Sequence, residues 1–561
     1  MNESALLHIT DSSYCFPISE NKITIRIRTA KDDINKVWLL FESKYKIGEV
    51  HKKASMHKTM SGRIYDYYSV TLTLEDTRLA YVFFLDDGKD KYYFSEDGLT
   101  EEYDFSKGYY NFFQYPFINK ADILPKVEWL SQAVFYQIFI DRFRIGNIEK
   151  DRSYINIFWG ELPSPKSLAG GDIKGIISKI DYIKDIGCNA LYLTPVFKSP
   201  SNHKYDTIDY FEIDPMFGDK ADLKALVEEL HKRDMKLVLD AVFNHVSEQN
   251  IIFQDVVKNG DNSPYYDWFV IRGRYPQKSP LNYEVFAECD YMPKWNTSNP
   301  SVQEYLIAVA LHYIEEFNID GWRLDVSDEI SHDFWRNFRK AIKNARYDAV
   351  IIGENWHDAS NYLHGDQYDS IMNYAFTKCA LDYFAYGKQN ARETAEKLND
   401  ILARNTDTVN DMMLNLLDSH DTNRFYSEVS ENPRKLHAAI CLLYLFPGSP
   451  SIFYGTELYT PGGYDPDCRR CMDWNAADFS KNNTISELLK KLSEVRSICH
   501  FSFEGTRIYS SSDGKLLCVT RQGQGGRAVL YINQSDSVGH DGNVCISPGE
   551  YKIFLNGGEV L

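Results

Sequence analysis

Eight short apolar segments alternate with amphipathic ones along the middle of the chain, and this alternation restricts the fold more than any other feature. The apolar segments are rich in β-branched and aromatic residues and too short to be helices, which predicts buried strands. They comprise residues 133–140, 190–197, 236–242, 321–326, 349–353, 370–374, 413–417 and 451–454. Helical spacing of apolar residues occurs between most of them, at residues 176–186, 221–233, 301–317, 331–345 and 433–445. Strands and helices alternating in this number predict a (β/α)8 barrel.

Charged residues and histidines stand where several of these segments end. The fourth segment carries Arg323 and Asp325, and the ends of other segments supply Asp240, His245, Glu354, His420 and Asp421. The carboxyl ends of barrel strands share one face, so we expect these side chains to converge. An isolated Arg-x-Asp is more often a structural ion pair at a strand end. Convergence with the other groups favours a functional site.

Three carboxylates on one face, Asp325, Glu354 and Asp421, suit acid and base chemistry at an acetal carbon. Glycoside hydrolysis requires one carboxylate as nucleophile or ion-pair partner and one protonated acid at the leaving oxygen. We expect the adjacent Arg323 to lower the pKa of Asp325 and keep it ionised. Taken singly, each motif also fits a structural role, as a helix cap, a core histidine or a surface turn.

The segments on either side of the barrel have strand patterns. Residues 1–122 contain β-rich segments at 22–30, 37–42, 65–75, 79–86 and 91–95, which predict an N-terminal β-sandwich. We assign residues 123–500 to the barrel, with an inserted subdomain at 246–299 after the third strand, where a long stretch lacks periodicity. Residues 501–561, which follow a helical segment at 484–499, predict a C-terminal β-sandwich. The expected fold is therefore multidomain, a central TIM barrel between two β-sandwiches.

Composition narrows the partners and the compartment. The 561 residues carry a net charge of −18, which argues against binding to nucleic acid phosphates. The N-terminus lacks a basic segment followed by an apolar one, and no run of about 18 apolar residues follows, so we expect neither secretion nor a membrane. Ten scattered cysteines suit reduced thiols in a cytoplasm. Cys468 and Cys471 form the only C-x-x-C and lack a second pair, so we expect no metal ligands there.

Four stretches give a family resemblance. They are DAVFNH (240–245), GWRLDV (321–326), GENW (353–356) and LLDSHD (416–421). In order and spacing they resemble the four conserved regions of the α-amylase family of glycoside hydrolases. The resemblance implies that Asp325 is the nucleophile, Glu354 the general acid/base, and Asp421 the carboxylate that holds the glucose of subsite −1, in a retaining reaction. It also implies a −1 subsite formed by Arg323, His245, His420, His203 and Tyr205.

The stretch MPKWN (292–296) resembles a signature of the neopullulanase, cyclomaltodextrinase and maltogenic amylase group, with Trp295 in place of Leu. Members of that group carry an N-terminal sandwich that packs against the partner's barrel in a homodimer. The stretch YDPDCRRCM (464–472) also resembles the group and places Asp465 and Arg469 at subsite −2. The resemblance also implies three further substrate-binding residues, namely Trp356 in GENW, Lys294 in MPKWN and Glu329 shortly after GWRLDV.

Two departures from the group stand out. After Asp325 the group reads V-A-N-E, whereas this chain has Val326, Ser327, Asp328 and Glu329, which leaves open the balance between hydrolysis and transglycosylation. Some relatives bind calcium through an oxygen-rich loop and a G-G-D. Here G-G-D (170–172) is kept, but the loop RIGNIEKD (144–151) has Lys150 where an oxygen ligand is expected. We therefore expect no required cofactor and a weak or absent calcium site, with the lysine supplying the charge.

The leading hypothesis is a cytoplasmic, homodimeric enzyme that cleaves α-1,4-glucosidic bonds of cyclomaltodextrins, maltooligosaccharides and pullulan or starch to maltose or panose. An α-glucosidase or oligo-1,6-glucosidase is the enzymatic alternative, and MPKWN argues against it. A non-catalytic α-glucan-binding protein is the alternative from another class. Such proteins usually lack a catalytic carboxylate, and all three are present here.

Overall fold

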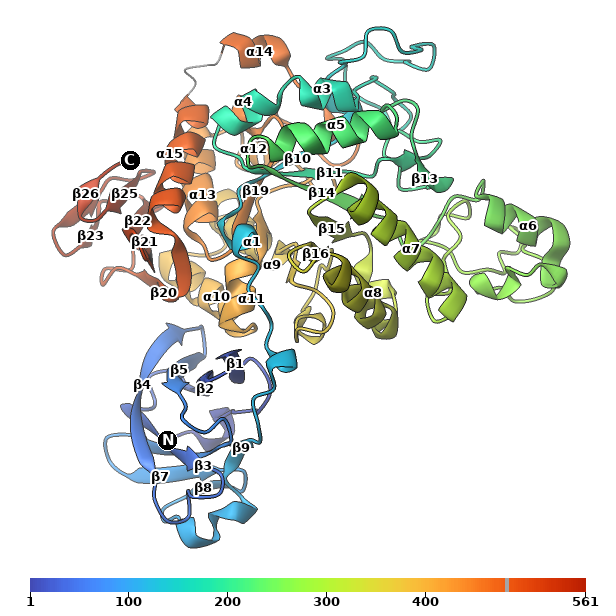
Figure 1. Cartoon of the computed structure of the whole chain (residues 1–561). Helices are drawn as coiled ribbons and strands as arrows, with labels where there is room; N and C mark the ends of the chain where they lie inside the picture. Colours follow the sequence, from blue (N-terminus) through green and yellow to red (C-terminus); the bar gives the residue numbers. More distant parts are fainter. Residues whose placement is uncertain (480–483) are drawn as a thin grey trace. The chain divides into compact units, whose positions relative to one another are not determined.

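The computed structural model describes residues 1–479 and 484–561, which contacts divide into two compact units (Figure 1). The barrel unit comprises Val127–Tyr386 and Met412–His500. The terminal unit comprises Met1–Lys126, Gly387–Asp411 and Phe501–Leu561. The sequence boundaries at 122/123 and 500/501 do not anticipate that residues 387–411 cluster with the two ends of the chain.

Eight parallel strands form the barrel, as the alternation predicted. Their order is β17-β16-β15-β14-β11-β10-β19-β18, and the bridge between Met372 and Leu414 joins the two ends of this order. Each strand lies within or close to a predicted segment: β10 (Phe135–Ile138), β11 (Ala190–Leu193), β14 (Lys236–Ala241), β15 (Gly321–Leu324), β16 (Val350–Gly353), β17 (Ser370–Ile371), β18 (Leu414–Leu416) and β19 (Ser449–Phe453). Parallel pairing places all their carboxyl ends on one face.

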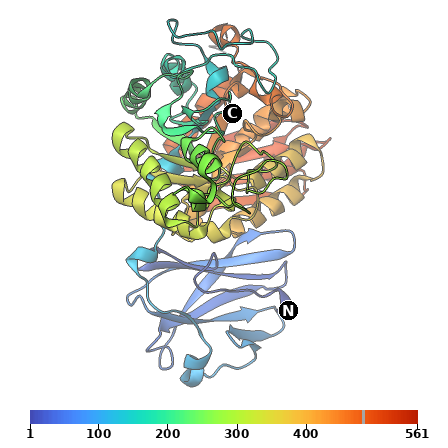
Figure 2. The same cartoon turned by 90° about the vertical axis from the view of Figure 1, so that its right-hand side faces the viewer.

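Helices surround these strands (Figures 1 and 2). They include α5 (Lys220–His231), α7 (Pro300–Phe317), α8 (His332–Ala345), α13 (Pro433–Leu445) and α15 (Thr484–Cys499), close to their predicted limits. The expected helix at 176–186 was wrong in one respect, because α3 (Ile173–Ile177) and α4 (Ile180–Asp185) are separate. Lys179, between them, leaves the helical conformation at φ −123° and ψ 9°.

The segment between β14 and α7 contains α6 (Ile251–Asn259), short 3-10 turns and isolated bridges. Trp295 anchors it, because the indole is 1% exposed and stacks on Phe269 with ring centroids 4.8 Å apart. The indole N–H donates to the Tyr210 hydroxyl at 3.1 Å. The tryptophan that departs from the MPKLN-type signature is therefore a packing residue that holds this insertion against the barrel.

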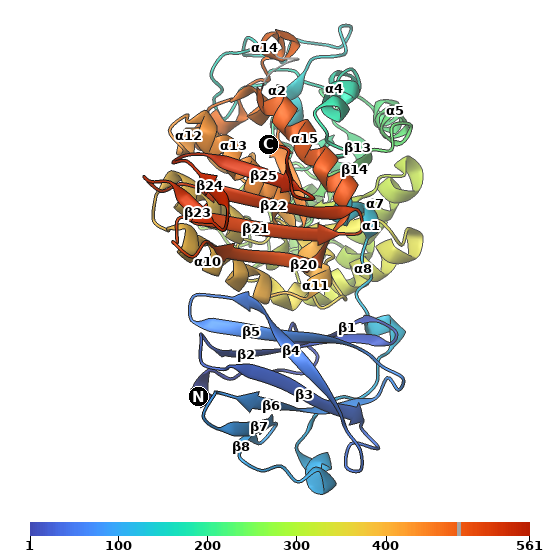
Figure 3. The same ribbon diagram turned by 90° about the vertical axis from the view of Figure 1, so that its left-hand side faces the viewer.

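The terminal unit contains two β-rich modules and the helical segment 387–411 (Figure 3). Nine antiparallel strands form the N-terminal module: β1 (Cys15–Ser19), β2 (Lys22–Ala30), β3 (Lys36–Ser43), β4 (Lys52–Ser61), β5 (Tyr65–Thr73), β6 (Leu79–Asp86), β7 (Lys91–Ser95), β8 (Gly98–Thr100) and β9 (Phe113–Tyr115). The C-terminal module consists of β20 (Phe501–Ser510), β21 (Leu516–Gly523), β22 (Gly526–Asn533), β25 (Tyr551–Leu555) and β26 (Gly558–Glu559), with the pair β23 (Gly539–Asp541) and β24 (Val544–Ile546). Both modules match the predicted all-β character.

Candidate active site

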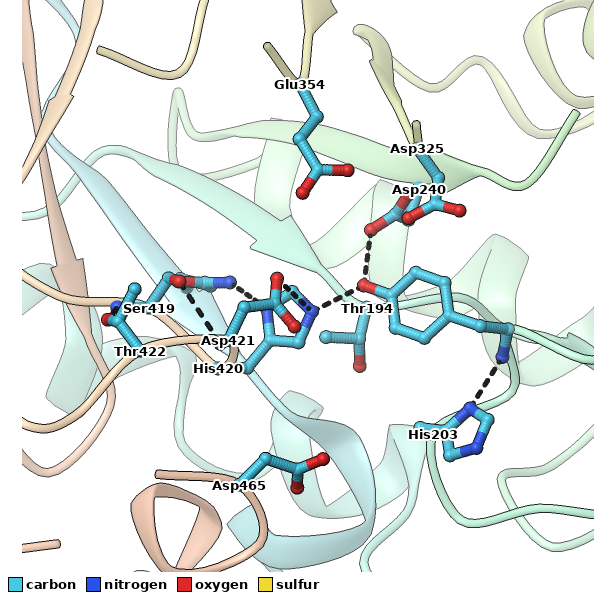
Figure 4. A network of polar contacts seen from close by, with 12 residues as sticks. Thr194, His203, Asp240, Asp325, Glu354, Ser419, His420, Asp421, Thr422 and Asp465 are labelled. Carbon is cyan, nitrogen blue, oxygen red and sulfur yellow. Dashed lines mark hydrogen bonds and ion pairs between the residues drawn. The ribbon is translucent and has the colours of Figure 1, made fainter. Parts of the chain in front are cut away.

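The carboxyl ends of the barrel strands bring the predicted acidic residues to one cavity of about 740 Å³. Asp325 directly follows β15, and Glu354 directly follows β16. Asp421 lies in the loop after β18, and Asp240 lies at the end of β14 (Figure 4). Asp325, Glu354 and Asp421 line the cavity, whereas Asp240 is fully buried.

The guanidinium of Arg323 connects three of these carboxylates. Its Nη1 lies 3.0 Å from both oxygens of Asp240 and 3.0 Å from Oδ1 of Asp325. Its Nη2 lies 2.9 Å from Oε2 of Glu354. The arginine is 1% exposed, so these ion pairs are shielded from water. One buried cation therefore fixes Asp325 and Glu354 beside each other.

The backbone after Asp325 is strained in a way that serves the site. Val326 has φ 46° and ψ 44°, in the left-handed region that β-branched residues avoid. In this conformation its N–H donates to Oε2 of Glu354 at 2.9 Å. The strained peptide thus ties the loop after β15 to the carboxylate after β16.

The expectation that Arg323 lowers the pKa of Asp325 was wrong in its net result. Burial and the neighbouring Glu354 carboxylate raise the pKa of Asp325 well above its usual value of 3.8, and Arg323 offsets this only in part. Oδ2 of Asp325 is buried without a hydrogen-bond partner among the described residues. It is therefore the oxygen left free to attack a substrate.

Asp240 begins a hydrogen-bond chain beneath the cavity. Its Oδ2 accepts from the hydroxyls of Tyr192 at 2.6 Å and Tyr205 at 2.9 Å. The Tyr205 hydroxyl lies 2.6 Å from Nε2 of His420, and the Gln137 amide nitrogen donates to Nδ1 of His420 at 2.7 Å. The proton of a neutral His420 must therefore be on Nε2, which donates to Tyr205. Burial holds the pKa of His420 well below its usual value, which is consistent with that neutral form.

His245 and His203 form part of the cavity wall. His245 stacks on Phe286 with ring centroids 4.6 Å apart. Burial, with the nearby charge of Lys294, lowers the pKa of His245 to about 3, so the imidazole is neutral at pH 7. Its Nε2 is buried and has no partner within the described ranges. His245 thus presents an unused polar atom to a ligand that enters the cavity.

Arg469 holds Asp465 and Asp421 together in the cavity lining. Its Nη1 pairs with Asp465 at 2.9 Å, and its Nη2 lies 3.3 Å from Oδ1 of Asp421. Its Nε donates to the backbone carbonyl of His420 at 2.8 Å. The two residues assigned to subsite −2 by resemblance are therefore adjacent to Asp421, and Arg469 positions it.

Trp356 lies at the rim next to Glu354. Its indole N–H donates to Oε1 of Glu354 at 3.1 Å, and its ring stacks on Tyr374 with centroids 3.6 Å apart. The side chain remains 46% exposed, so the indole offers an apolar surface for a sugar.

Four predicted site residues do not line the cavity. Arg323 and His420 lie buried behind it, and Lys294 and Glu329 pair with each other at 2.8 Å. Direct contact of these four residues with substrate stays a prediction. Other lining residues had not been predicted, namely Phe286, Cys289, Tyr291, Thr377, Leu381, Tyr386, Thr422, Asn423 and Glu428. Four of the additional lining residues were part of a recognised motif, namely Met292, Val326, Leu417 and Tyr464.

Comparison with protein families decides the assignment. The model described as "Alpha amylase, catalytic domain" matches residues 137–494. The chain belongs to the α-amylase family. The model "Alpha amylase, N-terminal ig-like domain" matches residues 1–119, which agrees with the N-terminal strands.

Relatives in the α-amylase family are similar over most of their length. A cyclomaltodextrinase from Thermoanaerobacter pseudethanolicus is 40% identical over 538 residues, which cover 95% of this chain and 93% of the relative. An intracellular maltogenic amylase from Bacillus subtilis is 39% identical over 503 residues, which cover 88% of this chain and 84% of the relative. A solved structure of a cyclomaltodextrinase matches with a TM-score of 0.91 at 35% identity, over 96% of this chain and 92% of that one.

The chain is therefore a glycoside hydrolase of the α-amylase family, which acts on α-glucosidic bonds. Within residues 1–479 and 484–561, no helix has the length and apolar character that crossing a membrane requires.

The raised pKa of Asp325 predicts an acid limb in the pH profile. Attack requires the carboxylate, so kcat/KM should fall as pH decreases through this pKa, above the usual value of 3.8. Glu354→Gln removes the negative charge that raises this pKa, so the limb should move to lower pH. The measurement is kcat/KM against pH on maltosyl fluoride, whose leaving group needs no protonation.

Asp366→Asn is the matched control, because Asp366 is a partly exposed carboxylate paired with Arg336. It should leave the limb in place. A limb that stays fixed in Glu354→Gln would contradict the Coulombic origin of the raised pKa.

Proposed function

We propose that the enzyme cleaves α-1,4-glucosidic bonds of cyclomaltodextrins and maltooligosaccharides with retention, gives mainly maltose or panose, and also acts on pullulan and starch. The observation that carries this proposal is the Arg323 cluster, which holds Asp325 and Glu354 next to each other at the cavity. A similar chain named cyclomaltodextrinase, alignable over nearly the whole length, supports the choice of substrate.

In the proposed reaction, Oδ2 of Asp325 attacks the anomeric carbon while Glu354 protonates the leaving glycosidic oxygen. A covalent glucosyl-enzyme forms, and the leaving saccharide takes the proton. Glu354 then removes a proton from water, whose oxygen displaces Asp325 and restores both carboxyl groups. A second saccharide in place of water gives transglycosylation. Asp421 and Nε2 of His245 bind hydroxyls of the −1 sugar.

Asp325→Asn should lower kcat by about four orders of magnitude or more, because an amide of almost the same shape is a poor nucleophile. The dissociation constant for maltotriose should change little, because the other cavity residues remain. Stopped assays of reducing-end release measure kcat, and calorimetric titration measures the dissociation constant for maltotriose. Asp366→Asn is the control for a lost carboxylate outside the cavity lining and should retain most of kcat.

Full hydrolysis by Asp325→Asn would contradict the assigned nucleophile. Loss of maltotriose binding together with turnover would point to a structural role for Asp325.

We further propose a cytoplasmic homodimer in which the N-terminal module of one subunit borders the cleft of the other. The support is the matched N-terminal domain and the name of the similar intracellular maltogenic amylase. The expected outcome is a mass near twice 65.0 kDa and a kcat/KM higher for β-cyclodextrin than for soluble starch. Light scattering measures the mass, and kinetics in the same buffer measure kcat/KM for the two substrates.

A monomer that prefers starch would contradict the subgroup assignment while leaving the family intact. Rapid cleavage of isomaltose would favour the oligo-1,6-glucosidase alternative.

We also propose that the enzyme needs no calcium, because Lys150 occupies the position where the loop would hold an ion. Its Nζ donates to the carbonyls of Gly170 at 2.6 Å and Met216 at 2.9 Å, and pairs with Asp172 at 2.9 Å. A cation site with an ammonium inside it does not fit calcium, which requires six to eight oxygen ligands.

EDTA should therefore leave the melting temperature unchanged. Lys150→Met should lower the free energy of unfolding by about 3 kcal/mol, because it removes the cation that pairs with the buried Asp172 carboxylate and leaves it only backbone N–H donors. Lys166→Met, at an exposed lysine between this loop and Gly170, is the control. Differential scanning calorimetry gives both values. A melting temperature that EDTA lowers and calcium restores would refute the proposal.

A further inference from the structure

The terminal unit contains a second cavity, of about 350 Å³, that the catalytic residues do not reach. Its walls come from three parts of this unit: β2, β4 and β5 of the N-terminal module, α10 (Ala391–Ala403) with the start of α11 (Asp407–Met412), and β20 of the C-terminal module. Figure 3 shows these elements close together, and contacts of α10 with β4 and β20 connect them. The volume falls in the range of roughly 300–1,000 Å³ that is usual for small-molecule sites.

The wall from the N-terminal module is a row of hydroxyl groups. Strand register places Thr24 opposite Thr71 and Arg26 opposite Ser69, so these four side chains share one face of the sheet. The Thr24 and Thr71 hydroxyls lie 2.9 Å apart, and Nε of Arg26 donates to Ser69 at 3.3 Å. Sheet faces that are covered by other elements are normally apolar. A polar face beneath a cavity points to a polar ligand.

An ion pair with a buried arginine lines the cavity. Nη2 of Arg26 lies 2.8 Å from Oδ1 of Asp407, with the arginine side chain 1% exposed and that of Asp407 26% exposed. Oδ2 of Asp407 receives no hydrogen bond from the described residues, so it remains available as an acceptor at the cavity. The pair is neutral as a whole, and the lining adds one exposed acidic and one exposed basic side chain, Glu504 and Arg507. The cavity is therefore not built for an anion or a cation.

Thr506 on β20 supplies the observation that points to a missing partner. Its side chain is 6% exposed and lines the cavity, yet its hydroxyl has no hydrogen-bond partner in the described part of the chain. Leaving a buried hydroxyl unpaired costs about 1 to 3 kcal/mol. Apolar side chains complete the lining, namely Met60, Val70, Leu402, Phe503 and Ile508.

We propose that this cavity is a second saccharide site, which binds a short neutral sugar of the size of maltose. Hydroxyl groups that both donate and accept, one carboxylate oxygen and apolar side chains suit the hydroxyls and C–H faces of such a sugar. The choice of maltose rests on the proposed function, since maltose is the expected product. A bound sugar would connect the N-terminal module, α10 and the C-terminal module, and would raise the stability of the terminal unit.

The test uses the full-length chain with Asp325→Asn, so that saccharide is not turned over. Calorimetric titration with maltose should resolve two sites. Adding Thr506→Val, which removes only the hydroxyl, should weaken one site by about tenfold and leave the other unchanged. Thr506→Ser keeps the hydroxyl and should retain both affinities.

Thr520→Val is the matched control, because Thr520 is also buried with an unpaired hydroxyl, on the neighbouring strand β21, and does not line the cavity. It should leave both sites unchanged. Crystals of Asp325→Asn soaked with maltose give a second measurement that needs no cavity variant. Sugar density within hydrogen-bond distance of Thr506 would support the proposal.

Density in the catalytic cavity alone, with only water beside Thr506, would overturn it. A single binding site that Thr506→Val does not change would also overturn it. Either result leaves the proposed function intact, because hydrolysis is measured on the wild-type chain. If the wild-type chain did not hydrolyse α-glucans while Asp325→Asn bound maltose beside Thr506, the proposed function would be contradicted instead.

Discussion

The catalytic cavity depends on the buried guanidinium of Arg323. Asp240, Asp325 and Glu354 are close enough to repel one another in a space with little water, and Arg323 contacts all three. A planar guanidinium can serve several carboxylates at fixed angles, which a lysine cannot. Losing one partner of such a buried pair typically costs about 3 to 5 kcal/mol, since it leaves an uncompensated charge. The stability of this part of the barrel and the geometry of the reaction therefore depend on the same contacts.

The barrel also stabilises the strained backbone at Val326. A non-glycine residue in the left-handed region costs about 1 to 3 kcal/mol and persists only where its surroundings impose it. Strand β15 is paired on both sides, with β14 and β16, so its end has little freedom. The turn that follows directs the Val326 N–H to Glu354. The strain is thus the cost of placing two carboxylates from adjacent strands within reach of one bond.

The sequence predicted those features that follow from local pattern. Strands β2, β6 and β7 and helix α13 have the predicted limits, because alternation or helical spacing is strong there. Strand β4 was missed, since Met56 and Met60 are its only buried residues and the rest of the strand is mostly polar, including Lys52, Lys53 and Lys58. The meeting of charged residues on one face followed from parallel topology alone. The raised pKa of Asp325 did not, because it depends on how completely the folded chain excludes water.

Burial of the histidines explains how the cavity suits its reaction. Burial keeps the pKa values of His245 and His420 low, so neither adds positive charge at pH 7. Arg323 is then the main cation beside Asp240, Asp325 and Glu354. Even with Glu354 protonated as the acid, the two ionised aspartates outweigh the single arginine, so the cluster keeps an excess of negative charge. A glucan is neutral in the ground state, whereas the oxocarbenium-like transition state is positive. Fixed negative charge in a dry cavity therefore favours the transition state over the bound substrate, and this difference is what accelerates the reaction.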